Sequence, residues 1–391
     1  MKHLIILLDG TWNDQLDNTN VWRLKGMVAP RSRDGVEQKV YYHAGVGTRW
    51  YDRFRGGAFG QGLYENVQGA YQWLMENYDG DPDPDDDRND DDKVFVFGFS
   101  RGAYTARSLG GMITKCGLLS PGAPLSLSQV YRLYKLGPQL RPLYRLQYLR
   151  RRGLNGEPDF NAEERLLLDY SSRILIKLMG VWDTVGALGI PIGFFTGINR
   201  RAYGFLHTNL ANNVERCYQA LAIDENRREY DAAVWTRFIP RDPSPPSPRP
   251  VAAGAKREPI VEQRWFPGAH ANVGGGYPNN PLAQLSLNWM QNVAQQAGLE
   301  FRATVRLKGD ERMAPVTDSY RQFIKGAYRF LRRRFYRSIN RAAAARERGI
   351  VETVNETIDQ SVAQKWRGDP KYRPENLLDW ERRTGRRVAD I

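Results

Sequence analysis

The sequence contains only two cysteines, Cys116 and Cys217, among its 391 residues. Two thiols cannot build a disulfide framework or a cysteine-rich metal cluster, so small proteins held together in either way are excluded. Both cysteines fall in segments that we expect to be helical, and we interpret them as buried structural thiols. We find no other pattern that demands a metal or a cofactor, and we expect the protein to work without either.

Long hydrophobic runs are also missing. No stretch reaches the roughly 18–20 apolar residues that a helix needs to span a bilayer. The first apolar segment, Leu4–Leu8, is too short for the core of a signal peptide and leads directly into a polar turn. We therefore expect the protein to be made in the cytoplasm without a signal peptide, and to need a dedicated system if it acts elsewhere.

Acidic residues are outnumbered, and the formal net charge is +13. Such an excess favours an anionic partner, which could be nucleic acid, an anionic membrane or an acidic protein. Many of the acids crowd into residues 79–92, where Asp79, Asp81 and Asp83 have the spacing of a calcium-binding loop. Pro84 stands where such a loop requires glycine, so we interpret the segment as a solvated connection.

Strand and helix patterns alternate along the chain, as a mostly parallel sheet with flanking helices requires. We expect strands at 4–8, 40–42, 93–97, 174–182 and 263–266, and helices at 61–78, 102–117, 209–221 and 281–297. The pattern therefore predicts an α/β fold. Two segments depart from the alternation, an insertion at 120–172 and a basic, helical region at 315–391.

A G-x-S-x-G sequence, Gly98–Gly102, lies between an expected buried strand and an expected helix. This context is typical of a nucleophile elbow, a tight turn that needs small neighbours on both sides of the serine. We predict Ser100 as the nucleophile, in preference to an ordinary turn that caps a helix. The N–H of Arg101 would form half of an oxyanion hole, and the N–H of Gly10 or Thr11 is the candidate for the other half.

A serine nucleophile needs a histidine as its base, and in this arrangement the histidine follows the serine in the chain. Only His207 and His270 come after Ser100. His270 follows a strand end and precedes a turn with three successive glycines, whereas His207 stands at an expected helix start. We therefore predict His270 as the base.

The acid that orients this base should end a strand between the serine and the histidine. Asp183 directly follows the expected strand 174–182 and fits both conditions. Asp224 follows an expected helix, and Asp9 precedes the serine. We therefore predict Asp183 as the acid.

Five segments together resemble the catalytic domain of type VI secretion lipase effectors. They are DGTWN at 9–13, GVGT at 45–48, GFSRGA at 98–103, VWDTVG at 181–186, and FPGAH with VGGGY at 266–277. The resemblance runs in order from residue 1 to about Leu377. In one departure, Asn272 stands where the family commonly has an aspartate two residues after the histidine.

The resemblance implies an α/β-hydrolase-like domain over residues 1–391 that cleaves phospholipid acyl esters as a phospholipase A-type enzyme. It implies the serine, aspartate and histidine roles for Ser100, Asp183 and His270. It also implies a phospholipid membrane surface as substrate, a secretion-spike protein and a cognate immunity protein as partners, and action on the membranes of a target cell.

Two other functions remain open from the sequence. One is an esterase that acts on a soluble ester. The other is a non-catalytic protein that binds nucleic acid through its basic surface, but a binding protein has no reason to keep serine, aspartate and histidine in catalytic order, so we expect no nucleic acid partner. The basic, aromatic stretches 131–152 and 321–348 are either membrane contacts, the first within a lid at 120–172, or amphipathic helices packed on the sheet.

Overall fold

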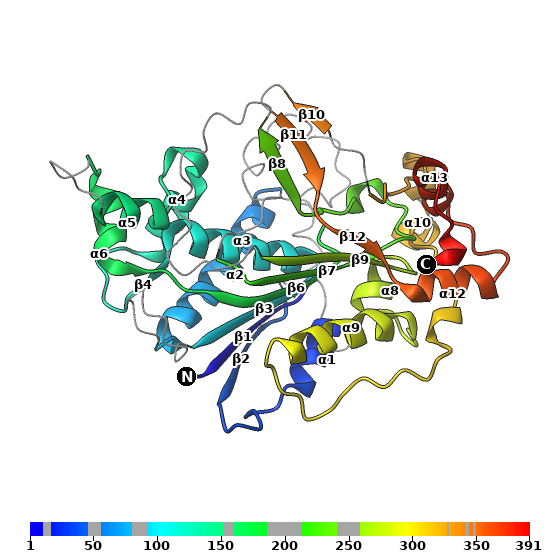
Figure 1. The fold of residues 1–391 in the computed structure, drawn as a ribbon, viewed down its shortest axis with the longest axis horizontal. Coiled ribbons are helices and arrows are strands. Elements are labelled where there is room, and N and C mark those ends of the chain that lie inside the picture. The colour runs from blue at the N-terminus through cyan, green and yellow to red at the C-terminus, as the bar shows by residue number, and fades with distance from the viewer. Residues whose placement is uncertain are drawn as a thin grey trace.

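The computed structural model describes residues 1–10, 17–45, 56–79, 92–151, 159–185, 213–240, 259–326, 328–340, 344–346 and 349–391. Seven parallel strands form its main sheet, in the order β12-β9-β7-β6-β3-β1-β2 (Figure 1). These are β1 His3–Leu8, β2 Gln38–His43, β3 Lys93–Phe99, β6 Ile176–Trp182, β7 Arg216–Ala222, β9 Ile260–Phe266 and β12 Glu356–Ile358. The predicted α/β architecture is confirmed.

Helices cover both faces of this sheet. The helices α2 (Gly56–Asn77) and α3 (Arg101–Cys116) pack on one face, and α1 (Asn20–Met27) and α9 (Leu282–Gln296) pack on the other. The strand β1 is buried on both sides, because a parallel strand between two helical layers needs apolar side chains at successive positions. This burial explains the unbroken apolar run from which the first strand was predicted.

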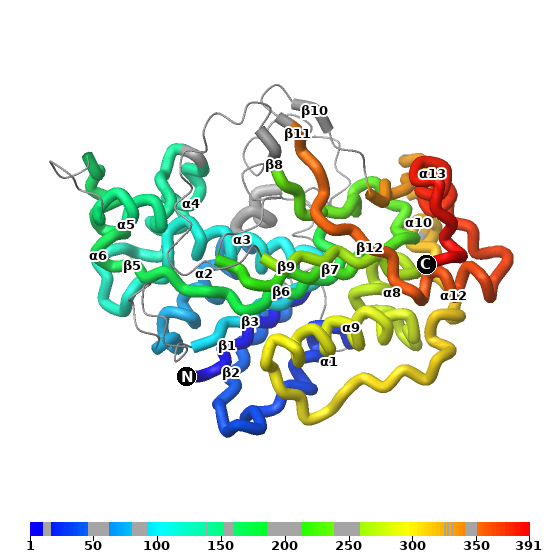
Figure 2. Tube along the Cα trace, viewed as in Figure 1, coloured from blue at the N-terminus to red at the C-terminus, as the bar shows by residue number. Residues whose placement is uncertain are grey.

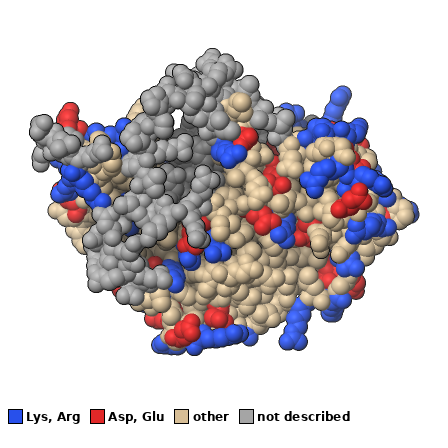
Figure 3. Space-filling view, viewed as in Figure 1, with Lys and Arg blue, Asp and Glu red and all other residues tan. Residues whose placement is uncertain are grey.

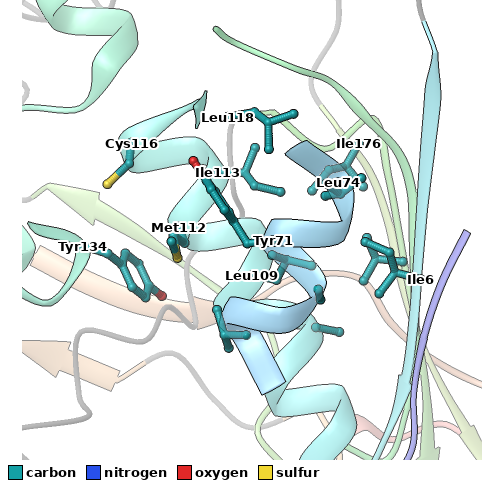
Figure 4. Close-up of a cluster of buried hydrophobic side chains, with 14 of the residues drawn as sticks. Ile6, Tyr71, Leu74, Leu109, Met112, Ile113, Cys116, Leu118, Tyr134 and Ile176 are labelled. Atoms are coloured by element: carbon teal, nitrogen blue, oxygen red, sulfur yellow. The ribbon is translucent and has the colours of Figure 1, made fainter. Parts of the chain in front are cut away.

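Figure 4 shows the core between the sheet, α2 and α3. Tyr71 of α2 lies across α3, and its hydroxyl donates to the carbonyl of Gly117 at 2.8 Å. The same oxygen accepts from the N–H of Leu119 at 3.0 Å. One tyrosine therefore fixes the end of α3, the helix whose other end follows Ser100.

One expected helix, 209–221, is wrong. Residues 209–212 lie outside the described part, and from Arg216 on the segment is the strand β7, in which Cys217 is buried. β7 lies between β6 and β9, so both of its faces are covered and nearly every side chain is buried. A short run that is apolar on every face cannot be told from a buried helix by its periodicity.

The C-terminal region is less helical than predicted. It contains α10 (Ser319–Gln322), α11 (Tyr328–Leu331), α12 (Gln360–Gly368) and α13 (Glu375–Thr384), but also β12 and the strands β10 (Ala344–Arg346) and β11 (Gly349–Thr353). β11 pairs with β8 (Thr236–Pro240), and β12 extends the main sheet beside β9. The β-branched residues of β11 and β12 favour strand in these two short segments. Figure 2 shows the late part of the chain closing one end of the sheet.

The insertion at 120–172 contains α4 (Leu127–Lys135), α5 (Leu143–Arg151) and α6 (Ala162–Tyr170), and the strands β4 (Leu118–Leu119) and β5 (Ser171–Ser172) bracket it. Lys115, near the end of α3, donates to the carbonyl of Gly137 at 2.6 Å. The tyrosines and leucines at 131, 133, 134, 143 and 146 are buried in the core. The structure thus shows helices packed against α3, and the lid function of this segment stays a prediction.

None of the helices in the described ranges is long and apolar enough to cross a membrane.

Candidate active site

Ser100 stands at the turn from β3 into α3, with φ 57° and ψ −119°. This conformation is strained for a residue other than glycine, and such strain is characteristic of functional turns. The turn passes so close to β1 that a Cβ atom at Gly102 would collide with the carbonyl oxygen of Leu8. A Cβ atom at Gly98 would lie 2.5 Å from the carbonyl oxygen of Gly102. The glycines of the motif therefore let three segments meet at Ser100.

His270 begins the short helix α8 (His270–Gly274), after the turn that follows β9. Its Nε2 lies 2.8 Å from the Ser100 Oγ, and its Nδ1 lies 2.5 Å from the Asp183 Oδ2. The imidazole ring is held between the rings of Phe99 and Tyr230, whose centroids lie 4.7 and 5.1 Å away. A proton on Nδ1 donates to the carboxylate, which leaves Nε2 to accept the serine proton.

Asp183 follows β6 and has a positive φ of 41°. Its Oδ1 accepts from the Ala222 N–H at 3.0 Å and from the Arg337 Nη1 at 2.6 Å. Its Oδ2 accepts from His270 and, at 3.0 Å, from the Arg337 Nη2. Burial alone would raise the pKa of Asp183, but the charge of Arg337 and the bond from His270 lower it to about 2. The carboxylate is therefore ionised across the ordinary pH range.

The structure thus brings Ser100, Asp183 and His270 together at the carboxyl ends of β3, β6 and β9. Burial lowers the pKa of His270, and the bond to Asp183 opposes that effect. The lowered pKa keeps the imidazole neutral near pH 7, as a general base must be. The arrangement can take a proton from the serine hydroxyl and stabilise the imidazolium that results.

A second buried carboxylate, Glu225, lies beside this group and was not predicted. It accepts from the backbone N–H of His270 at 3.2 Å, from the Arg227 Nε and Nη2 at 2.8 Å each, and from the Ser319 hydroxyl at 3.0 Å. Arg227 in turn lies over the Tyr230 ring, 3.5 Å from its centroid. Because the strand before Glu225 was taken for a helix, nothing in the sequence reading placed this residue at the same sheet edge as Ser100.

The rejected acids, Asp224 and Asp9, support loops. Asp224 accepts from the Gly268 N–H at 2.7 Å and from the Tyr372 hydroxyl at 3.0 Å, which fixes the turn before His270. Burial raises the pKa of Asp224 to about 6.

Asp9 accepts from the Gly10 N–H at 2.8 Å and from the hydroxyls of Thr19 and Tyr42. The Gly10 N–H, a candidate oxyanion donor, is therefore engaged by the neighbouring carboxylate. The other candidate on this loop, Thr11, lies outside the described residues, as does His207. Arg101 is the first residue of α3 and directly follows Ser100, so its N–H lies at the start of this helix. No group of three metal-ligating side chains occurs within the described ranges.

The family model described as "T6SS, Phospholipase effector Tle1-like, catalytic domain" matches residues 2–293. The chain belongs to this family. The matched residues include Ser100, Asp183 and His270.

Known relatives are distant. The chain is 25% identical over 321 residues to an uncharacterized protein of Saccharomyces cerevisiae, and the match covers 73% of this chain and 43% of that protein. Among solved structures, an uncharacterized protein from Pseudomonas aeruginosa has a TM-score of 0.41 at 18% identity, covering 81% of this chain and 49% of the other. The Tle1 effector bound to the VgrG spike of a type VI secretion system has a TM-score of 0.34 at 18% identity, covering 72% and 52%. A sugar hydrolase, YeeB from Lactococcus lactis, has a TM-score of 0.30 at 10% identity, covering 75% and 90%. The chain thus spans about half the length of the first three.

Asn272 is the departure from the family pattern noted in the sequence. Both the oxygen and the nitrogen of its side-chain amide make hydrogen bonds. Its Oδ1 accepts from the N–H groups of Ala269 and Thr317 at 3.1 and 3.0 Å. Its Nδ2 donates to the Asn280 Oδ1 at 3.1 Å and to the Thr317 Oγ1 at 3.2 Å. An aspartate could not make the two donor bonds. Asn272 therefore connects the helix of His270 to Thr317, which lies beyond the family match.

Proposed function

We propose that the protein is a phospholipase of the A type, which cleaves the carboxylic esters of phospholipids with Ser100, His270 and Asp183 as its catalytic residues. The observation that carries this proposal is the hydrogen-bonded relay from the Ser100 Oγ through His270 to the buried Asp183 carboxylate, with distances of 2.8 and 2.5 Å. Membership in a phospholipase effector family supports the choice of substrate.

In the proposed reaction, the Ser100 Oγ attacks the acyl carbonyl while the His270 Nε2 takes the hydroxyl proton. The Arg101 N–H would stabilise the negative oxygen of the tetrahedral intermediate. Collapse of the intermediate breaks the ester bond, and the imidazolium returns its proton to the departing alcohol oxygen. Water then attacks the acyl-enzyme in the same way and releases a fatty acid.

The surface supports a lipid substrate. Lys and Arg side chains gather over the C-terminal elements on the face shown in Figure 3. Phe330 of α11 is 79% exposed, and the Arg329 guanidinium lies 4.8 Å from the centroid of its ring. An exposed aromatic ring beside cations suits an interface that is anionic outside and apolar within.

Two protein partners belong to this proposal. We propose that a type VI secretion spike carries the protein to the membranes of a target cell, since a related effector has been solved on such a spike. A cognate immunity protein would protect the producing cell.

Mass spectrometry of vesicles with mixed neutral and anionic phospholipids, incubated with the protein, tests the proposed reaction. We expect fatty acid and lysophospholipid to form with the wild type and not with the Ser100→Ala variant. Turnover of a short soluble ester with intact vesicles would favour a soluble-ester esterase. No turnover of either substrate, together with a salt-dependent mobility shift of DNA or RNA, would favour a binding protein.

A further inference from the structure

A fully buried guanidinium stands behind the proposed catalytic aspartate. Arg337 is 1% exposed, and its Nη1 and Nη2 each donate to one oxygen of Asp183, at 2.6 and 3.0 Å. The same two nitrogens also donate to the carbonyls of Ala222, at 2.8 Å, and Tyr230. These bonds fix the guanidinium to the end of β7 and to the segment that places the Tyr230 ring against His270.

Arg337 lies 154 positions after Asp183 and beyond the residues that match the family. Its Nε is buried with no hydrogen-bond partner among the described residues. A buried donor left unsatisfied costs free energy, so the side chain is held there by its contacts with Asp183 and the two carbonyls.

The charges around His270 balance only when Arg337 is counted. His270 faces the carboxylates of Asp183 and Glu225 and lies near the Arg227 cation, and the Tyr230 ring lies against its imidazole. Arg337 is attracted by the charges of Asp183, Glu225 and, less strongly, Asp231, and Asp231 is not among the main charges that act on His270. The inner group has two anions and two cations, so it is neutral with a neutral imidazole and carries one positive charge with an imidazolium.

Without Arg337, the charges around His270 would favour the imidazolium instead of the neutral imidazole. The inner group would then carry one negative charge with a neutral imidazole, and it would become neutral when His270 takes a proton. A nearby uncompensated anion favours the protonated form of a histidine. The base would then be blocked by a proton at pH values where the wild type has it free.

We propose that Arg337 is a positioning residue for the hydrolytic site, where its guanidinium orients the Asp183 carboxylate toward His270 and balances its charge, so that His270 stays an unprotonated base. The proposal rests on the proposed function, because it assigns Asp183 and His270 to one reaction. It also gives the C-terminal region a role in the chemistry, although Arg337 touches no reacting atom.

Two readouts test it. The first is the pH dependence of fluorophosphonate labelling of Ser100, and the second is the titration of His270 followed by NMR with labelled histidine, which is practical because the chain has four histidines. Arg337→Gln removes the charge and Arg337→Lys keeps it. Arg141→Gln is the matched control, because Arg141 makes a two-point pair with the buried Glu164 of α6, within the insertion.

We expect Arg337→Gln to raise the titration midpoint of His270 by about one pH unit. The acid limb of the labelling profile, which is the fall in the labelling rate of Ser100 toward low pH, should move up by the same amount. The plateau rate should fall about tenfold to a hundredfold, because the acid is no longer held in place. Arg337→Lys should keep the acid limb near that of the wild type but lower the plateau. Arg141→Gln should change neither readout.

An unchanged midpoint in folded Arg337→Gln, or an equal shift in Arg141→Gln, overturns the proposal. If Arg337→Gln does not fold, a wild-type plateau in Arg337→Lys overturns the orienting role, and a lowered plateau with a wild-type midpoint supports it. A wild type that is never labelled would overturn the proposed function instead, and the NMR titration would still decide whether Arg337 controls the protonation of His270.

Discussion

The residues that match the family, 2–293, and those that follow them contribute differently to the site. The turn of Ser100 is enclosed by the matched part, where β1 and the motif glycines press against it. The acid and the base, in contrast, are braced from the later part, by Arg337 on Asp183, by Thr317 on Asn272 and by Ser319 on Glu225. The family match contains the proposed reacting groups, but some of the residues that hold them in place lie beyond it.

The largest expected effect lies wholly in the matched part. Ser100→Ala should lower ester hydrolysis by about 10⁴–10⁶-fold, since the oxyanion hole and substrate binding alone leave only residual catalysis. The midpoint of thermal unfolding should stay near that of the wild type, because alanine accepts the same backbone conformation at about the same cost. Near-normal hydrolysis by the folded variant would contradict the assignment of the nucleophile.

A pH-dependent effect is expected where the two parts meet, at Asp224 and Tyr372. The folded-state pKa of Asp224 is about 6, against an ordinary 3.8, so the folded protein binds this proton more tightly than the unfolded chain does. The contribution to stability is therefore fully present below pH 4 and is lost as the pH rises through 6. Asp224→Asn, which carries no charge, should be more stable than the wild type by about 1–3 kcal/mol at pH 8.

Urea unfolding at pH 4 and pH 8 measures this difference, which should nearly vanish at the lower pH. Asp379→Asn is the control, because Asp379 is partly exposed and pairs with Arg383 on the surface of α13. An equal gain in the control, or no gain at pH 8 in Asp224→Asn, would show that burial of the Asp224 charge does not limit stability.

A smaller effect is expected at Ser319, whose hydroxyl reaches Glu225 from the later part. Ser319→Ala should reduce the free energy of unfolding by about 1–2 kcal/mol, the usual loss of a buried hydrogen bond to a charged group. Ester hydrolysis should fall only a few-fold, because Arg227 still holds the carboxylate. A loss as large as that of Ser100→Ala would mean that Glu225 itself takes part in the reaction.

The smallest effect is expected in the insertion, at the exposed ion pair of Arg150 and Asp169, with 2.9 Å between the two charged groups. Arg150→Ala should change the free energy of unfolding by less than about 0.5 kcal/mol. Hydrolysis of a short soluble ester should not change, since this pair lies on the helices packed at the far end of α3. A marked loss on the soluble ester would mean that the insertion acts on the site after all.

The sequence predicted what depends on neighbours along the chain. The Ser100 turn follows from five consecutive residues between a strand and a helix, and Asp183 and His270 follow from chain order and strand ends. The order of the strands and the supporting residues depend on contacts between distant segments. Arg337 shows the limit, because it ends a basic run, RRRFYR at 332–337, that is typical of a solvated surface. Arg332 and Arg333 are exposed in that run, and only the folded chain reveals that Arg337 turns inward.

The position of β12 has a consequence for the timing of assembly. This strand covers the edge of β9, the strand that leads to His270, and it leaves the ribosome about ninety residues later. Until then the strand of the base is an open edge. Arg337 is made shortly before β12, and Tyr372 is made after it. The turn of Ser100 can form early, but the base and the acid are braced only after the residues around β12 have been made. The nascent chain is therefore expected to stay inactive until these later residues have been made.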